Sequence, residues 1–137
     1  MERSTRQRSA IRSAIEAAGR PLSTQEVLDA AQAEVPAMGM ATVYRNVKLL
    51  IDAGEIAVVT LPGESPRYEA AQHAHHHHFQ CDLCRRVFDV HACPGDLTNL
   101  APPGFTVSHH ELTLYGECGE CAALPKTRAR RSSAATR

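Results

Sequence analysis

Apolar residues recur with helical spacing in three segments at the start of the chain. The first covers residues 11–18 and is followed by Gly19, a residue typical of helix ends. The second opens with Ser-Thr-Gln-Glu at residues 23–26, a capping-box pattern in which the Ser and Glu side chains satisfy free backbone N–H groups. The third covers residues 43–51 and ends before Gly54, which suits a left-handed C-terminal position. The pattern therefore predicts three helices.

Two runs with strand character follow these helices. Residues 56–61 and 67–70 flank the sequence Pro-Gly-Glu-Ser-Pro, which predicts a hairpin with a short turn. Three helices and a hairpin in this order favour a winged helix-turn-helix over residues 1–70. The alternative is a three-helix bundle with a β-arm that binds nothing.

The polar face of the third helix separates these two interpretations. If its apolar residues face the core, Tyr44, Arg45 and Lys48 point away from it near the helix N-terminus, the end that enters the major groove in helix-turn-helix proteins. Tyrosine can pack on a thymine methyl group, and arginine or lysine can bind a phosphate or a guanine edge. The face is therefore a candidate DNA-binding surface.

The net charge over the 137 residues is zero, which by itself argues against a nucleic-acid partner. The distribution of charge along the chain changes this interpretation. Charges sum to −1 through residue 70, −4 over residues 71–124 and +5 over residues 125–137. Four arginines also lie within the first 12 residues and suit backbone contacts to DNA. We expect the basic tail at 125–137 to be disordered.

All eight histidines and all five cysteines lie between residues 73 and 121. The pairs Cys81/Cys84 and Cys118/Cys121 are two CxxC motifs, and two such turns together give the four thiolates that a tetrahedral zinc ion prefers. A redox CxxC of the thioredoxin type is the alternative, but it needs one motif that opens a helix. We predict a structural zinc site.

A histidine run precedes the first of these motifs. In an extended strand His75 and His77 share one face and His76 and His78 the other, so the run offers two separate two-histidine half-sites. Completing them needs further ligands, and the candidates are Glu69, Asp89, Asp96, His109 and His110, the last two in a strand-like run over 105–115. A mixed set of nitrogen and oxygen ligands suits Fe(II), Mn(II), Co(II) or Zn(II).

These segments together resemble the ferric uptake regulator family of metal-responsive bacterial repressors. The matching stretches are ATVYRNVKLL at 41–50, HHHHFQCDLC at 75–84, the GF-x-V-x-HH run at 104–110 and LYGECGEC at 114–121. The resemblance implies a homodimer with an N-terminal winged helix-turn-helix and, at 71–124, a small C-terminal α/β dimerisation domain. It implies that metal orders the dimer for binding to a palindromic double-stranded DNA operator.

The resemblance also implies roles for individual residues. The two CxxC pairs match the family's structural zinc site, and Tyr44 and Arg45 match its recognition-helix pair, with Arg3 near the minor groove. The remaining ligands match two regulatory sites for Fe²⁺, Mn²⁺ or Zn²⁺: Glu69, His76 and His78 at the hinge between the domains, and His75, His77, Asp96 and His110 within the dimerisation domain.

This chain departs from the family at one hinge ligand. Many members carry a histidine just before the second helix, whereas this chain has Pro21 and Leu22 there. We take Asp89 as the first substitute and Cys93 as the second, although a small buried role before Pro94 is the stronger expectation for Cys93. The missing histidine argues against a peroxide sensor. The absence of a cysteine from residues 69–78 argues against a zinc-uptake regulator.

The sequence therefore predicts a repressor of iron, manganese or zinc uptake genes rather than an enzyme. A metal buffer or chaperone would need only the histidine run, and a zinc hydrolase or deaminase would need an HExxH or HxE…PCxxC motif, which the sequence lacks. No stretch approaches the roughly 20 apolar residues that span a bilayer, and the N-terminus lacks the apolar segment of a signal peptide, so we expect a cytoplasmic protein without membrane contact.

Overall fold

The computed structural model describes residues 2–72 and 74–125. Three helices open the chain: α1 (Glu2–Ala18), α2 (Thr24–Ala31) and α3 (Met40–Asp52). Their buried faces meet the inner side of a small sheet and form an aliphatic core that includes Ile11, Ile15, Val27, Val43, Val47 and Leu50. The predicted capping box is present: Ser23 Oγ accepts from the Glu26 N–H, and the Glu26 carboxylate accepts from the Ser23 N–H. Gly54 has φ +76°, as expected after α3.

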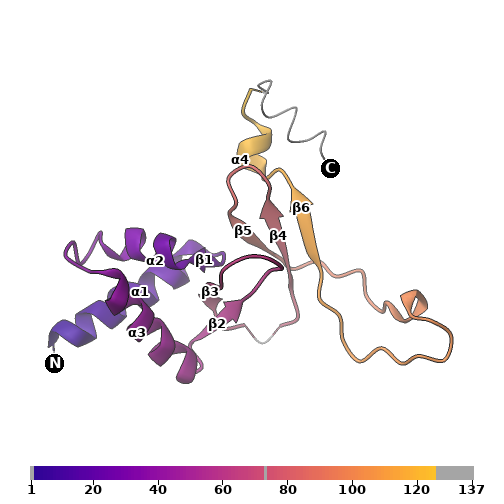
Figure 1. The fold of residues 1–137 in the computed structure, drawn as a ribbon, viewed down its shortest axis with the longest axis horizontal. Helices are drawn as coiled ribbons and strands as arrows, with labels where there is room; N and C mark the ends of the chain where they lie inside the picture. The colour runs from indigo at the N-terminus through magenta and orange to yellow at the C-terminus, as the bar shows by residue number, and fades with distance from the viewer. Residues whose placement is uncertain (1, 73, 126–137) are drawn as a thin grey trace.

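The first sheet has the order β1-β3-β2 and is antiparallel throughout. Strand β2 (Ile56–Val59) ends two residues earlier than predicted, and β3 (Arg67–Ala70) has its predicted bounds. Strand β1 (Leu22–Ser23) was not predicted, because two residues carry no readable alternation. Together with α1–α3 this sheet forms the N-terminal unit (Figure 1).

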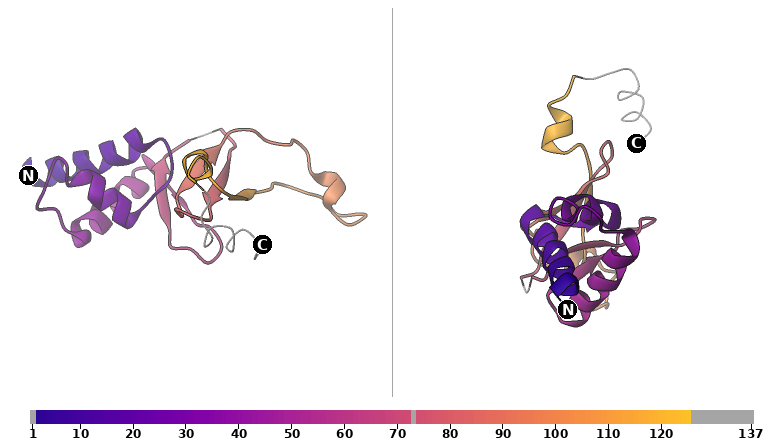
Figure 2. Two further views of the ribbon diagram at one scale, coloured as in Figure 1. Left: turned by 90° about the horizontal axis from the view of Figure 1, so that it is seen from above. Right: turned by 90° about the vertical axis from the view of Figure 1, so that its left-hand side faces the viewer.

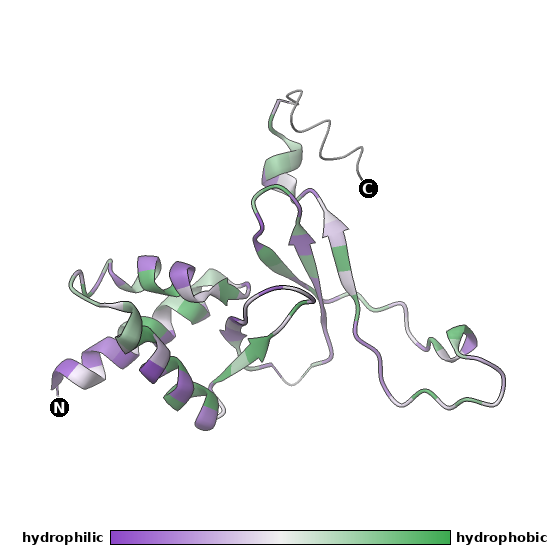
Figure 3. Ribbon diagram, in the orientation of Figure 1, coloured by the Kyte–Doolittle hydropathy of each residue, from purple (hydrophilic) through white to green (hydrophobic). Residues whose placement is uncertain are grey.

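A second sheet, of order β5-β4-β6, forms the C-terminal unit together with the short helix α4 (Gly119–Ala122). Strand β4 (His77–Cys81) lies in the middle, antiparallel to β5 (Val87–Val90) and parallel to β6 (Thr113–Gly116). Figure 3 shows that β2 is hydrophobic whereas β4 is largely hydrophilic. The central strand of the C-terminal unit therefore contributes little apolar surface to its core.

The segment between β5 and β6 projects away from both sheets, as Figures 1 and 2 show, and we call residues 91–112 the arm. Its one short helix is the 3₁₀ turn η1 (Thr98–Leu100). The prediction of a strand over 105–115 is wrong for residues 105–112, since no neighbouring strand lies beside this part of the arm to pair with it. The last 12 residues of the predicted tail, 126–137, lie outside the described residues.

The two units meet through a few specific contacts. Val59 and Leu61 pack on Val87 of β5, and the carboxylate of Glu64 accepts hydrogen bonds from Gln80 at 2.8 Å and Arg85 at 3.0 Å. None of the helices in the described ranges is long and apolar enough to cross a membrane.

Candidate metal centres

Four cysteine sulfurs converge where β4 ends and α4 begins. Cys81 ends β4, Cys84 follows in a tight turn, Cys118 caps α4 and Cys121 lies within it. Arg85, at φ +65°, provides the left-handed position that closes the turn. The structure thus brings together all four cysteines that the sequence predicts as ligands.

The surroundings of two of these sulfurs favour thiolates. Burial would raise the pKa of Cys81, but N–H groups of Cys118 and Cys84 outweigh it and lower the pKa to about 6. Cys84 accepts from Arg86 Nε at 3.1 Å, and its pKa is also lowered. Burial and the neighbouring sulfurs raise the pKa of Cys121 to about 12, as expected when four acidic groups share a site without a cation.

The spacing of the sulfurs fits zinc. Cys84 Sγ and Cys118 Sγ lie 3.9 Å apart. A tetrahedron of thiolates with Zn–S bonds near 2.3 Å has edges of about 3.8 Å. The four cysteines can therefore hold one structural zinc ion with little rearrangement.

A second group lies where the two units meet, and we call it the hinge group. It consists of Glu69 on β3, His76 before β4, His78 on β4 and Asp89 on β5. His78 and Asp89 are direct cross-strand partners. The Nε2 atoms of His76 and His78 lie 2.7 Å and 3.4 Å from Glu69 Oε1, and the His78 nitrogen lies 3.4 Å from Asp89 Oδ1. One ligand therefore comes from the N-terminal sheet and three from the other side of the hinge.

The ring of His76 is oriented by two neighbouring oxygens. Its Nδ1 lies 3.1 Å from the Ala74 carbonyl oxygen, which can only accept, so Nδ1 carries a proton. The neutral ring then turns the lone pair of Nε2 toward Glu69 Oε1 at 2.7 Å. Burial would lower the pKa of His76, but the Ala74 carbonyl and the Glu69 carboxylate raise it, so a second proton or a metal ion can stand between Nε2 and Glu69 Oε1. The backbone contact thus orients His76 as a metal ligand.

The carboxylates of the hinge group are also short of partners. Glu69 Oε2 and Asp89 Oδ1 are buried without a hydrogen bond. Burial would raise the pKa of Glu69, but hydrogen bonds from His78, Asp89 and His76 lower it to about 2; burial and the nearby Glu69 raise the pKa of Asp89 to about 6. The nearby Glu69 thus opposes ionisation of Asp89, and a divalent cation between the two carboxylates would relieve this repulsion.

Asp89 occupies the position that we predicted for the substitute hinge ligand, whereas Cys93, the second choice, lies elsewhere. Pro21 and Leu22 are buried and bring no ligand to the group. Arg20, next to them, donates to Glu26 at 2.6 Å and lies over the ring of Phe88, beside Asp89.

A third group contains His75, His77 and His110, as predicted, but its fourth member is Cys93. Asp96 is not part of it, and its carboxylate instead accepts hydrogen bonds from the N–H and hydroxyl of Thr98, the first residue of η1. The expectation of a small buried Cys93 is also wrong, because the residue is exposed. The register of β4 against β5 brings Cys93 into the group. His77 pairs with Val90, so the residues after Val90 lie beside those before His77.

The candidate DNA-binding residues are all exposed. Tyr44, Arg45 and Lys48 are exposed on α3, while the neighbouring Val43, Asn46 and Val47 are buried. Asn46 donates to the Thr42 carbonyl, so its amide is used within the helix. Arg3 is exposed near the start of α1.

Comparison with known proteins identifies the relatives of this chain. Residues 2–115 match the model of the ferric uptake regulator family. The peroxide operon regulator of Bacillus subtilis is 33% identical over 104 residues, which cover 73% of this chain and 70% of that protein. The chain belongs to the ferric uptake regulator family.

Solved structures of this family agree with the fold. A zinc-bound manganese uptake regulator matches with a TM-score of 0.71 at 27% identity, over 82% of this chain and 87% of that one. The ferric uptake regulator of Francisella tularensis with iron matches with a TM-score of 0.66 at 27% identity, over 85% and 91%. The predicted fold, a winged helix-turn-helix followed by a small α/β domain, is confirmed, and so is the prediction of a metal-responsive repressor of this family, a family of transcriptional regulators.

Proposed function

We propose that this chain represses metal-uptake genes as a homodimer, and that an ion at the hinge group controls its binding to a palindromic DNA operator. Residues 1–70 form the DNA-binding domain and residues 71–124 the metal-binding dimerisation domain. The function is regulatory rather than catalytic, and we expect it in the cytoplasm, where the operator is.

The observation that carries the proposal is the mixed origin of the hinge group. Glu69 belongs to the sheet that packs under the recognition helix, whereas His76, His78 and Asp89 belong to the junction and the second sheet. All four ligand atoms converge only in one relative placement of the two domains. A bound divalent ion supplies the positive charge that favours this placement. If the operator binds best to the same placement, metal binding and operator binding strengthen each other.

The rest of the junction is suited to such a switch. Its apolar part consists of three side chains, Val59, Leu61 and Val87. Its polar part centres on Glu64, which accepts hydrogen bonds from Gln80 and Arg85 and lies 3.3 Å from Arg67. A contact this small orients the domains without locking them, because small polar interdomain surfaces permit relative motion.

The remaining predicted residues have separate roles in this proposal. Cys81, Cys84, Cys118 and Cys121 hold a structural zinc that stabilises the C-terminal domain. Tyr44, Arg45 and Lys48 read or position the operator from α3, and Arg3 contacts its backbone or minor groove.

The hinge group leaves the sensed ion among Fe(II), Mn(II) and Zn(II), because its ligands are nitrogen and oxygen atoms. The similarity to a peroxide operon regulator makes peroxide sensing the second candidate. A peroxide sensor and a metal-uptake regulator differ in their chemistry. A peroxide sensor with Fe(II) bound would gain oxygen on a hinge histidine after exposure to peroxide. Mass spectrometry of the peptide over residues 69–78 would detect this oxygen.

Operator binding measured with each metal tests the proposed function. A labelled duplex is first selected from a random DNA pool with the metal-saturated protein. We expect one of Fe(II), Mn(II) and Zn(II) to tighten binding by about 5- to 150-fold, the usual range of allosteric coupling. A metal buffer or chaperone would bind the ions and show no change on any duplex.

Variants of the recognition surface supply the control for this experiment. Arg45→Ala should weaken operator binding by about 5- to 150-fold while metal binding stays unchanged. Tyr44→Phe keeps the ring that packs on a base and should stay close to the wild-type affinity. Equal binding by Arg45→Ala and the wild type would contradict the assigned surface.

A further inference from the structure

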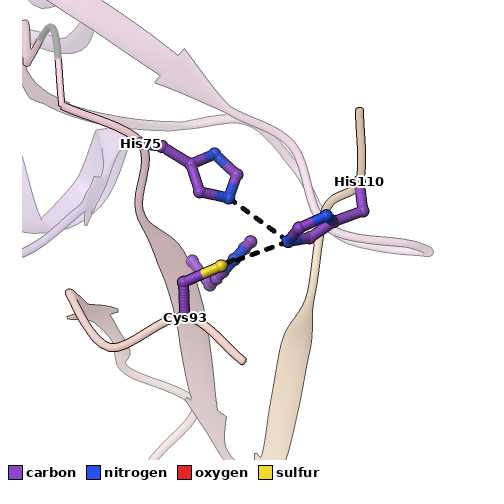
Figure 4. A group of neighbouring side chains, drawn as sticks. His75, Cys93 and His110 are labelled. Atoms are coloured by element: carbon purple, nitrogen blue, oxygen red, sulfur yellow. Dashed lines mark hydrogen bonds between the residues drawn. The ribbon is translucent and has the colours of Figure 1, made fainter. Parts of the chain in front are cut away.

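The group of His75, His77, Cys93 and His110 differs chemically from the hinge group because it contains a thiol. Figure 4 shows the rings of His75 and His110 and the sulfur of Cys93 pointing toward one another. The four ligand atoms all lie within 4.8 Å of one another. Three nitrogen donors and one sulfur donor therefore meet at one place.

The distances within this group match those expected around zinc. His75 Nε2 and His110 Nε2 lie 3.3 Å apart, and Cys93 Sγ lies 3.3 Å from His110 Nε2 and 3.5 Å from His77 Nε2. A tetrahedral zinc ion with Zn–N bonds of 2.0–2.1 Å and a Zn–S bond of 2.3 Å gives edges of about 3.3 Å between nitrogens and about 3.6 Å between nitrogen and sulfur. The measured distances agree with both edges to within about 0.3 Å.

The fold brings these residues together at the base of the arm. His77 pairs with Val90, so Cys93, just after β5, lies beside His75, just before β4. At the other end of the arm the Leu112 carbonyl accepts from the His78 N–H at 3.2 Å, which places His110 next to β4. An ion held by these side chains would join the two ends of the arm to the strand that also carries His78 of the hinge group.

His77 differs from the other two histidines in this group. The Leu112 N–H donates to its Nδ1 at 3.2 Å, so the neutral ring carries its own proton on Nε2, facing Cys93 Sγ. His77 can bind an ion through Nε2 only when this backbone hydrogen bond opens. Cys93, His75 and His110 therefore form the core of the group, and His77 completes it.

We infer that Cys93 is a thiolate ligand of this second site and that the site selects Zn(II), with Co(II) as its spectroscopic substitute, over Mn(II) and Fe(II). Thiolate is a soft ligand that favours zinc, whereas the hinge group offers only imidazole and carboxylate. One chain thus holds two regulatory-type sites with different metal preferences. The inference concerns metal binding alone and stands whether or not the protein binds DNA.

Cobalt titration of the zinc-loaded protein tests this assignment. The His76→Ala background removes competition from the hinge group, and zinc analysis before and after verifies that the four-cysteine site stays filled. We expect one equivalent of Co(II) to bind with the intense visible bands of tetrahedral coordination and a sulfur-to-cobalt charge-transfer band. Zn(II) should displace the Co(II) stoichiometrically, and Mn(II) at the same concentration should not.

Two substitutions, three residues apart in the chain, show whether Cys93 or Asp96 is the ligand. Cys93→Ser should remove the charge-transfer band and lower Co(II) affinity at least about tenfold, since loss of even an outer-shell partner costs 10- to 100-fold. Asp96→Asn, at the position that the sequence alone favoured, should leave the spectrum and the affinity unchanged. A charge-transfer band that survives in Cys93→Ser, or Co(II) binding that is lost in Asp96→Asn, would overturn the inference.

Discussion

The two units of this protein are stabilised in different ways. The N-terminal unit has an aliphatic core in which Ile11, Val27, Val43 and Leu50 are almost fully buried. In the C-terminal unit the buried cluster consists of three cysteines, with Phe79, Leu83, Cys84 and Phe88 only partly buried around them. We therefore expect the first unit to fold on its own side chains and the second to depend on what its cysteines bind. On this expectation, loss of metal affects the C-terminal unit while the N-terminal unit stays folded.

Removal of the structural zinc should have the largest effect. Cys84→Ser, or a strong chelator, should unfold β4–β6 and α4 and leave α1–α3 intact, because binding of structural zinc contributes about 10–16 kcal/mol in small zinc domains. Limited proteolysis or NMR of both units would show this. Cys93→Ser is the matched control and should keep the fold. A C-terminal sheet that persists without zinc in Cys84→Ser would show that the two units do not differ in this way.

A cavity in the aliphatic core should affect only the N-terminal unit. Leu50 is 1% exposed, and Leu50→Ala should cost about 2–5 kcal/mol of the free energy of unfolding. The neighbouring Leu49 is 44% exposed, and Leu49→Ala should change it by no more than about 0.5 kcal/mol. Thermal unfolding followed by helical circular dichroism would measure both. A loss of zinc from Leu50→Ala would contradict the independence of the two units.

Loss of the helix cap should have a smaller effect on the same unit. Ser23 Oγ accepts from the Glu26 N–H at 3.1 Å, and Ser23→Ala should cost about 1 kcal/mol of the free energy of unfolding. Ser13→Ala, on the exposed side of α1, is the control and should be neutral or slightly stabilising. Denaturant unfolding would compare the two variants, and an equal loss in both would argue against the cap.

The smallest expected effect is a pH dependence of the N-terminal unit. Burial would raise the pKa of Glu26, but hydrogen bonds from Arg20 and the Ser23 N–H lower it below its usual 4.5. A carboxylate whose pKa is lowered on folding stabilises the fold at any pH above its pKa in the unfolded chain. This contribution is lost as the pH falls through its pKa in the folded protein. The wild type should thus be up to about 1 kcal/mol more stable than Glu26→Gln at pH 7, and the difference should vanish in acid. A difference that grows in acid would contradict this.

Local patterns in the sequence predicted most of the N-terminal unit. Helical spacing located the second half of α1 and most of α3, but it missed that α1 begins at Glu2. The pair Ser23 and Glu26 located the start of α2. These signals act between residues close in the chain. The four cysteines were equally readable, since two CxxC turns carry their own geometry. Strand β1 was missed because its pairing with β3 is entirely non-local.

The third group depended on information that the sequence does not carry locally. Whether Cys93 or Asp96 joins His75 and His110 is decided by the register of β4 against β5 and by the turn that Asp96 forms with Thr98. The strand expected over 105–112 failed for the same reason: strand propensity needs a neighbouring strand, and the arm has none beside it in the described part of the chain.

The central claim is that an ion bound at the hinge group controls operator binding, and His76 tests it most directly. The measurement is the ratio of operator affinities with and without the activating metal, in the wild type, His76→Ala and His109→Ala. His109 is the matched control because it is exposed and belongs to none of the three ligand groups. We predict a ratio of about 5 to 150 for the wild type and His109→Ala, and a ratio near one for a folded His76→Ala. A wild-type ratio in His76→Ala would contradict the account.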